Sequence, residues 1–280
     1  MRRARRPARG SIHTVVFAPV LAILIAIGAV GTGRAAPMRI VSANLCADRL
    51  VIDMVPRERI LSVSRFAADP GLSPVSARAA GLPVNRGDAE EILALNPDLV
   101  VIGAFASRGA AALLRRAGVA VHEIPVAGDF EAARAAIRDL AGRLGVAARG
   151  EELIAELDAR IDALPRPARP LRALSLHAGG WVAGGGSLAD AVFARLGIVN
   201  AAGTRVGFAQ MDLETLLSRA PDLIAVERHG APAASGAGDP TTHPAVAGAL
   251  ARRVDISARD WACADGALAR AAAAIAGAAR

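Results

Sequence analysis

The residue types that most often carry out catalysis or bind metals form no recognisable set in this chain. Asp190 and Glu227 have no local nucleophile beside them, and no serine, histidine and acidic residue are arranged as a catalytic triad. Gly184 to Ser187 lack the spacing of a phosphate-binding loop and are better interpreted as a turn with Ser187 at a helix N-cap. The histidines beyond residue 35 also lack zinc-ligand spacing, although a cage of histidines and carboxylates from distant segments is an open alternative. These histidines are His122, His177, His229 and His243.

Aromatic and cationic side chains follow several predicted strands. In open α/β sheets, ligands bind beyond the carboxyl ends of the strands, so these positions are candidates for ligand contact. Aromatic rings there would stack on a flat ligand, and arginines would pair with carboxylates or catecholates. The chain contains no tyrosine, so a bond between a tyrosine and a metal is excluded. The candidates are Asn44, Arg65, Phe66, Asn85, Arg86, Phe105, His177, Trp181, Arg228, His229 and Trp261.

A thirteen-residue pattern occurs twice in the chain. Residues 88–100 recur as residues 212–224 without a gap, and six of the thirteen positions are identical. Each copy reads as a short amphipathic helix, a Pro-Asp turn and an apolar strand. Glu90 and Glu214 occupy the same place near the start of the helix in the two copies. The offset of 124 residues is far longer than a solenoid repeat of about 20–50 residues, so the repeat indicates two similar α/β lobes with a cleft between them.

The elements around the repeat alternate between strands and helices. This alternation predicts parallel βαβ units, and therefore two Rossmann-like lobes with central, mostly parallel sheets. Asp88 is expected to cap the helix that contains Glu90 and Glu91. Strands are predicted at 39–41, 60–63, 99–102, 119–121, 171–176 and 223–226. Helices are predicted at 45–55, 89–95, 110–117, 130–144, 147–164 and 187–196, in the second copy of the repeat and in an Ala-rich final segment.

One long helix separates the two α/β runs. Ile154, Leu157, Ile161 and Leu164 are spaced for a single apolar face, and prolines at 165, 167 and 170 end the segment. A helix in this place would form a stiff connection between the lobes. We therefore predict a first lobe at 36–145, a linker helix at 146–165 and a second lobe at 166–280.

The first 35 residues have the pattern of a cleaved export signal. Five arginines precede a nearly unbroken apolar run at 15–30, and Gly33 and Ala35 place small residues at the −3 and −1 positions of a cleavage site. An uncleaved anchor is the alternative. The chain carries a net charge of +7, of which six charges are arginines of this segment, leaving +1. The basic character is therefore no indication of nucleic-acid binding.

Cys46 and Cys263 are the only cysteines of the chain. Each precedes or begins a helix, one in each lobe, and an exported protein meets an oxidising compartment. A disulfide between them, two separate thiols, or one reactive thiol beside the ligand are all compatible with the sequence.

The ordered set of motifs resembles the periplasmic substrate-binding proteins of iron-siderophore, haem and vitamin B12 importers. The most specific stretch is residues 90–100, whose Pro-Asp-Leu-Val precedes a strand that begins with Gly118 and Val119. Residues 42–44, residues 62–64 and the late Asp260-Trp261 are similar to further landmarks of the family. The resemblance covers the chain from about residue 39 to about residue 276, and it implies two α/β lobes joined by one long helix.

The resemblance implies a binding protein rather than an enzyme. Its expected ligand is a metal chelate, foremost a ferric siderophore and next a corrinoid such as vitamin B12, with haem as the third member of the set, and no resident cofactor is expected. Glu90 and Glu214 match the carboxylates that meet arginines of an ABC permease dimer, although both also suit the positive ends of their helices. We expect a periplasmic monomer that binds no nucleic acid. A two-lobed enzyme with a cleft active site and a membrane-tethered ligand sensor are the rival interpretations.

Overall fold

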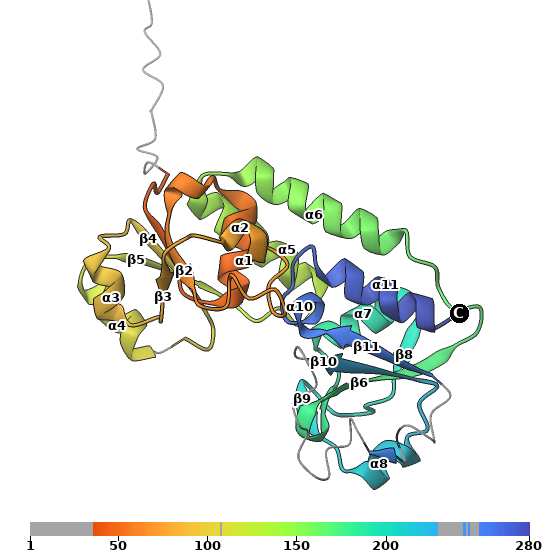
Figure 1. Ribbon diagram of the computed structural model, residues 1–280. Coiled ribbons are helices and arrows are strands. Elements are labelled where there is room, and N and C mark those ends of the chain that lie inside the picture. The colour runs from red at the N-terminus through yellow and green to blue at the C-terminus, as the bar shows by residue number, and fades with distance from the viewer. Residues whose placement is uncertain (1–35, 107, 229–242, 245, 247–251) are drawn as a thin grey trace, which may run out of the picture. The chain divides into compact units, whose positions relative to one another are not determined.

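The computed structural model describes residues 36–106, 108–228, 243–244, 246 and 252–280, which all belong to one structural unit. Two α/β lobes form this unit, each around its own sheet (Figure 1). The predicted export signal lies outside the described residues. Among the residues that are described, no helix is long and apolar enough to cross a membrane.

The sheet of the first lobe is fully parallel and has the order β3-β2-β1-β4-β5. The order reverses between β1 and β4, so the loops that follow these two strands diverge and leave a crevice. Ile40 and Val41 of β1 belong to apolar clusters on opposite faces of the sheet, as expected when helices cover both. The strands are β1 (Ile40–Ser42), β2 (Ile60–Ser64), β3 (Val84–Asn85), β4 (Leu99–Gly103) and β5 (Ala120–Ile124).

The helices of the first lobe follow their strands closely. Asn44 caps α1 by accepting from the backbone N–H groups of Cys46 and Ala47. Asp88 precedes α3 as predicted but makes no capping bond, so that prediction is wrong in detail. Its carboxylate lies 3.8 Å from the Arg86 guanidinium instead. The helices are α1 (Leu45–Met54), α2 (Ser76–Ala79), α3 (Ala89–Ala94), α4 (Arg108–Arg116) and α5 (Phe130–Leu144), with a short 3-10 helix η1 (Arg57–Arg59).

The second lobe has a mixed sheet rather than a purely parallel one. Strands β6, β8, β10 and β11 pair in parallel, whereas β7 and β9 extend the sheet in antiparallel fashion. The reversal between β6 and β7 uses Gly179 and Gly180, both with positive φ. The elements are β6 (Leu171–His177), η2 (Ala178–Gly180), β7 (Trp181–Ala183), α7 (Leu188–Leu196), β8 (Ile198–Asn200), β9 (Phe208–Gln210), α8 (Leu213–Ser218), β10 (Leu223–Arg228), β11 (Arg253–Ser257), α10 (Ala258–Trp261) and α11 (Leu268–Ala278).

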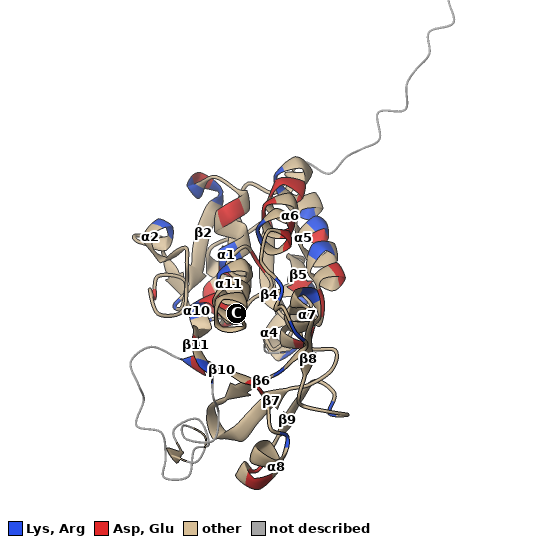
Figure 2. Ribbon diagram, turned by 90° about the vertical axis from the view of Figure 1, so that its right-hand side faces the viewer, with Lys and Arg blue, Asp and Glu red and all other residues tan. Residues whose placement is uncertain are grey.

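The long helix predicted between the lobes is α6 (Ala147–Asp162), which ends two residues earlier than predicted. It contributes Ile154 to the apolar cluster of the first lobe and Leu157 to that of the second. Two arginines of α5, Arg134 and Arg138, pair with Asp158 and Glu151 of α6, and charges of both signs are visible along these helices (Figure 2). The exact domain boundaries stay a prediction.

The repeat has a structural explanation that is the same in both lobes. Asn96 and Ala220 occupy equivalent positions after their helices and both adopt positive φ, 53° and 42°. Two residues later, Asp98 accepts from the backbone N–H of Arg39, and Asp222 accepts from that of Arg172. Each aspartate thereby ties the repeat strand to the start of the central strand of its sheet, and this bond sets the register of the two strands.

Asp48 is a carboxyl group buried in the first lobe, on α1. It accepts hydrogen bonds from the backbone N–H and the hydroxyl of Ser64, at 3.0 and 2.5 Å. Burial is the largest influence on this group and raises its pKa from 3.8 to about 6, although the bonds from Ser64 oppose the rise.

We expect Asp48 to make the free energy of unfolding depend on pH. The folded state holds the Asp48 proton more tightly than the unfolded chain does. The stabilisation that protonated Asp48 adds to the free energy of unfolding is therefore complete below pH 3.8 and is lost as the pH rises through about 6. The pKa difference corresponds to about 3 kcal/mol. Asp48→Asn should lack this part of the pH dependence. Urea unfolding of both proteins between about pH 4 and pH 7 measures it, and parallel curves would contradict the prediction.

Candidate functional site

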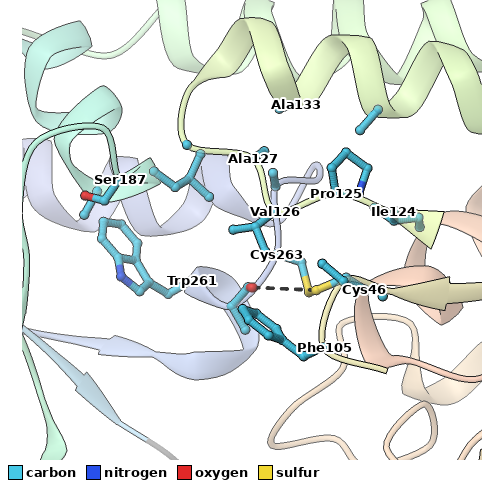
Figure 3. Close-up of a pocket in the computed structure, with 18 of the residues that line it drawn as sticks. Cys46, Phe105, Ile124, Pro125, Val126, Ala127, Ala133, Ser187, Trp261 and Cys263 are labelled. Carbon is cyan, nitrogen blue, oxygen red and sulfur yellow. Dashed lines mark hydrogen bonds between the residues drawn. A yellow bond between two sulfur atoms is a disulfide. The ribbon is translucent and has the colours of Figure 1, made fainter. Parts of the chain in front are cut away.

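A cavity of about 460 Å³ lies between the two lobes, within the size range of small-molecule sites. Its walls come from both lobes: Figure 3 labels Cys46, Phe105 and Ile124 to Ala127 from the first, and Ser187, Trp261 and Cys263 from the second. Most of the lining is aliphatic or aromatic. The described lining residues are Asn44, Cys46, Leu50, Gly103, Ala104, Phe105, Ile124, Pro125, Val126, Ala127, Gly128, Ala133, Ala136, Ile137, His177, Gly186, Ser187, Leu188, Ala189, Gly207, Phe208, Glu227, Trp261, Ala262, Cys263 and Ala264.

The cavity lies where the carboxyl ends of parallel strands meet. Asn44 follows β1, Phe105 follows β4 and Pro125 follows β5, while His177 ends β6 and Glu227 lies near the end of β10. This position agrees with the rule from which the candidate residues were chosen. The fold therefore brings together loops from five strands that are far apart in the sequence.

The two lobes are joined beside the cavity by a covalent and an ionic contact. A disulfide links Cys46 to Cys263, whose Cα atoms are 5.5 Å apart, and both residues line the cavity. Nearby, Arg49 of α1 donates from Nη2 to Oδ1 of Asp265 at 2.6 Å, and its Nε atom lies 2.6 Å from Oδ2 of the same carboxylate. Both side chains are buried. Burial raises the pKa of Asp265, and Arg49 opposes this rise.

A second close approach of the lobes lies at the start of α7. A Cβ atom at Gly128, in the loop after β5, would come within 2.4 Å of the Gly186 carbonyl oxygen. Only glycine allows the two backbones to approach this closely. Gly186 belongs to the Gly-rich turn that the sequence predicted before Ser187, whose hydroxyl does cap α7 by accepting from the N–H of Asp190.

Two polar side chains of the cavity, His177 and Glu227, come from neighbouring strands and form a hydrogen-bonded group with Ser175, which lies behind them. The Nδ1 atom of His177 lies 2.5 Å from Oε2 of Glu227, and its Nε2 atom lies 3.1 Å from the Ser175 hydroxyl. The Phe208 ring packs edge-on against the imidazole, 4.9 Å between centroids. Ser175 is buried and does not line the cavity. The hydrogen-bonded Ser175, His177 and Glu227 therefore present no serine nucleophile to a molecule in the cavity.

Sequence reasoning missed Glu227, although a signal for it exists. Parallel strands β6 and β10 are in register from Asp222, whose carboxylate binds the N–H of Arg172. Five residues further along each strand lie His177 and Glu227. In the first lobe, Arg39 and Asp98 are the equivalent pair. The residues five positions after them are Asn44 and Gly103, and both also line the cavity.

Of the predicted contact residues, four line the cavity: Asn44, Phe105, His177 and Trp261. The Asn44 side-chain oxygen is occupied as the cap of α1. Phe105 is 90 % exposed, and Trp261 is buried against the core of the second lobe. A ligand role for these residues is a proposal that binding measurements must test.

The other predicted residues do not line this cavity. Trp181 is half-exposed on β7, and the Arg65 guanidinium stacks 4.7 Å from the ring centroid of Phe66. Arg228 pairs with Asp255 at 3.3 Å. Asn85 is buried and donates to the Ser42 carbonyl and the Ser62 hydroxyl, which makes it a structural residue. The exposed Arg86 lies 3.8 Å from both Asp88 and Glu91, and His229 lies outside the described residues.

No arginine stands among the described residues that line the cavity, and Glu227 is the charged residue there. The described residues also contain no group of three histidines, cysteines or acids that could hold a metal ion. The residues present suit an apolar ligand and offer it one acidic contact.

Glu90 and Glu214 lie outside the cavity, in the first turns of α3 and α8. Both side chains are exposed, and neither makes an ion pair with a described residue. Their role in docking stays a prediction.

We expect no free thiol in the unfolded, unreduced protein. Cys46 and Cys263 close a loop whose constraint stabilises the folded state by at most about 5 kcal/mol on chain-entropy grounds. The reduced protein should stay folded, because Arg49 and Asp265 still join the same two elements. Thiol titration in denaturant, with a Cys46→Ser, Cys263→Ser double variant as the blank, measures this. Two reactive thiols per chain would show that the cysteines are not bonded.

The comparisons with known proteins agree with this geometry. A family profile described as periplasmic binding protein matches residues 40–249. No curated protein sequence matches the chain. Among solved structures, the apo periplasmic haem-binding protein RhuT from Roseiflexus sp. RS-1 is 28 % identical, with a TM-score of 0.68, and the match covers 86 % of this chain and 99 % of that one.

Two further solved structures share the fold. The haem-binding protein BhuT, solved with two haems, is 24 % identical with a TM-score of 0.68, over 86 % of this chain and 99 % of that one. HutB of Vibrio cholerae, also described as a periplasmic haem-binding protein, is 20 % identical with a TM-score of 0.68. The match covers 86 % of this chain and 98 % of that one.

Proposed function

Because this chain belongs to the periplasmic binding proteins of ABC importers, we propose that it captures haem in the cleft between its lobes and delivers it to an import permease. The observation that carries the proposal is the character of the cavity. Its described lining is aliphatic and aromatic and contains no arginine. A flat macrocycle with a large apolar surface suits such walls, with aromatic rings against its faces.

The same observation changes the order of the ligands that the sequence suggested. A ferric siderophore was the first expectation, with arginines to pair with catecholates or carboxylates. The cavity offers no described arginine for that purpose, and burying an unpaired anion is costly. The 28 % identity to RhuT, which is described as haem-binding, supports haem in preference to a siderophore or a corrinoid.

The proposed role is binding and delivery, without catalysis. The hydrogen-bonded group of Ser175, His177 and Glu227 has the composition of a catalytic triad but not its function, because Ser175 is buried on β6. A catalytic serine needs an exposed hydroxyl and neighbouring donors for the developing negative charge. The hydrogen bonds among Ser175, His177 and Glu227 instead hold the Glu227 carboxylate in one orientation.

Delivery needs a contact with the permease, and we assign it to Glu90 and Glu214. Each is an exposed carboxylate, one on each lobe, at equivalent places of the repeat. A pair of like charges on two lobes can recognise a two-fold partner that carries two cationic sites. Export by cleavage of the segment before Ala36 places the protein where this contact is made.

The binding role predicts a clear difference between two phenylalanines. Phe105→Ala should weaken haem binding by about tenfold, since stacking and burial of one aromatic ring contribute about 1 kcal/mol or more. Phe66→Ala is the matched control, because Phe66 does not line the cavity. The haem affinity of the Phe66→Ala protein should equal that of the parent. Titration followed by the haem absorption band measures both. A folded parent protein that binds no haem at micromolar concentration would refute the proposed function.

The docking role predicts loss of transport without loss of binding. Glu90→Gln together with Glu214→Gln should abolish haem uptake into cells or permease vesicles, while the haem affinity stays at the parent value, because neither residue lines the cavity. A control with Glu58→Gln and Glu123→Gln removes the same charge from other exposed positions. Uptake by the Glu90 and Glu214 variant at the parent rate would show that these carboxylates do not dock.

A further inference from the structure

Glu227 carries the one charge among the described residues that line the cavity. Its side chain is 11 % exposed, and that of its partner His177 is 10 % exposed. The Oε2 atom is held by His177 at 2.5 Å, whereas Oε1 has no hydrogen bond or ion pair with any described residue. Oε1 is not among the buried side-chain atoms that lack a partner, so it keeps accessible surface on which a ligand can bind.

The hydrogen bonds behind Glu227 keep this oxygen in place. Nδ1 of His177 shares a hydrogen bond with Oε2, and its Nε2 atom is engaged by the Ser175 hydroxyl. Both ring nitrogens are therefore occupied. The edge of Phe208 packs against the same imidazole and limits its rotation. What the pair offers to the cavity is consequently the remaining oxygen of Glu227.

The neighbouring cation does not neutralise this carboxylate. Arg228 follows Glu227 on β10, and successive side chains of a strand point to opposite faces of the sheet. Its guanidinium pairs with Asp255 of β11 instead, at 3.3 Å. The carboxylate therefore adds a negative charge to a cavity whose other described walls carry none.

We propose that Oε1 of Glu227 faces the metal centre of the bound chelate and makes the site selective for chelates whose centre is positively charged. This inference rests on the proposed function, because it names the contact that the chelate makes in the same cavity. A ferric porphyrin centre carries one positive charge and is attracted, a zinc porphyrin centre is neutral, and a ferric tris-catecholate is strongly anionic and is repelled.

The test compares ligands that differ at the centre only. Ferric, zinc and metal-free protoporphyrin IX are titrated into the parent, Glu227→Gln and Glu123→Gln proteins. Glu227→Gln keeps the shape of the side chain and an oxygen for His177 but removes the charge, whereas Glu123→Gln removes a charge from an exposed position of β5 that does not line the cavity. Ferric porphyrin should lose about tenfold or more in affinity for Glu227→Gln alone.

Metal-free and zinc porphyrin should bind the parent and Glu227→Gln equally. Glu227→Asp, which keeps the charge, should retain the preference for the ferric form even if its stability is lower. Equal losses for all three porphyrins in Glu227→Gln would reduce Glu227 to a structural residue and overturn the inference, as would no loss for any of them.

A separate arm distinguishes this inference from the proposed function. If the folded parent protein binds no porphyrin, the haem proposal fails, and the charge selectivity is then tested with a ferric tris-catecholate and a neutral ferric tris-hydroxamate. Glu227→Gln should bind the tris-catecholate more tightly than the parent does and bind the tris-hydroxamate equally well. An unchanged or weaker affinity for the tris-catecholate would overturn the inference independently of haem.

Discussion

The pairing of Arg49 with Asp265 is the contact on which the relation between the two lobes depends. It joins α1 of the first lobe to the segment before α11 of the second, and both groups are buried. Removing one partner of such a pair leaves an unpaired buried charge and costs about 3–5 kcal/mol. The disulfide between Cys46 and Cys263 joins the same two segments, three and two residues away. The wall of the cavity is thus built on a joint with both a covalent and an ionic part.

Much of the fold could be predicted from the sequence, because its main elements carry strong local signals. The apolar strands β4 and β10 follow the Pro-Asp turn of the repeat, and α5 has both its cap at Asp129 and its terminating Gly145. The elements that were missed have weak signals. Strands β7 and β9 are three residues long, lie among glycines and pair in antiparallel fashion, so neither length nor alternation identifies them.

The candidate site was predicted less completely, for two physical reasons. An arginine after a strand has a long flexible side chain, and its direction depends on partners such as Asp255 for Arg228, which sequence position does not reveal. Glu227 matters only because the register of β6 and β10 places it beside His177. Residues with short links to the strand ends, such as Asn44 and Phe105, were easier to identify.

The double connection between the lobes also has a kinetic consequence. The helix α6 and the disulfide attach the lobes at two points of the chain that are independent of each other. A body held at two points keeps rotation about the line through them as its one large movement. Any opening of the cavity that keeps both connections intact would then be a swing of one lobe about this axis rather than a separation of the lobes.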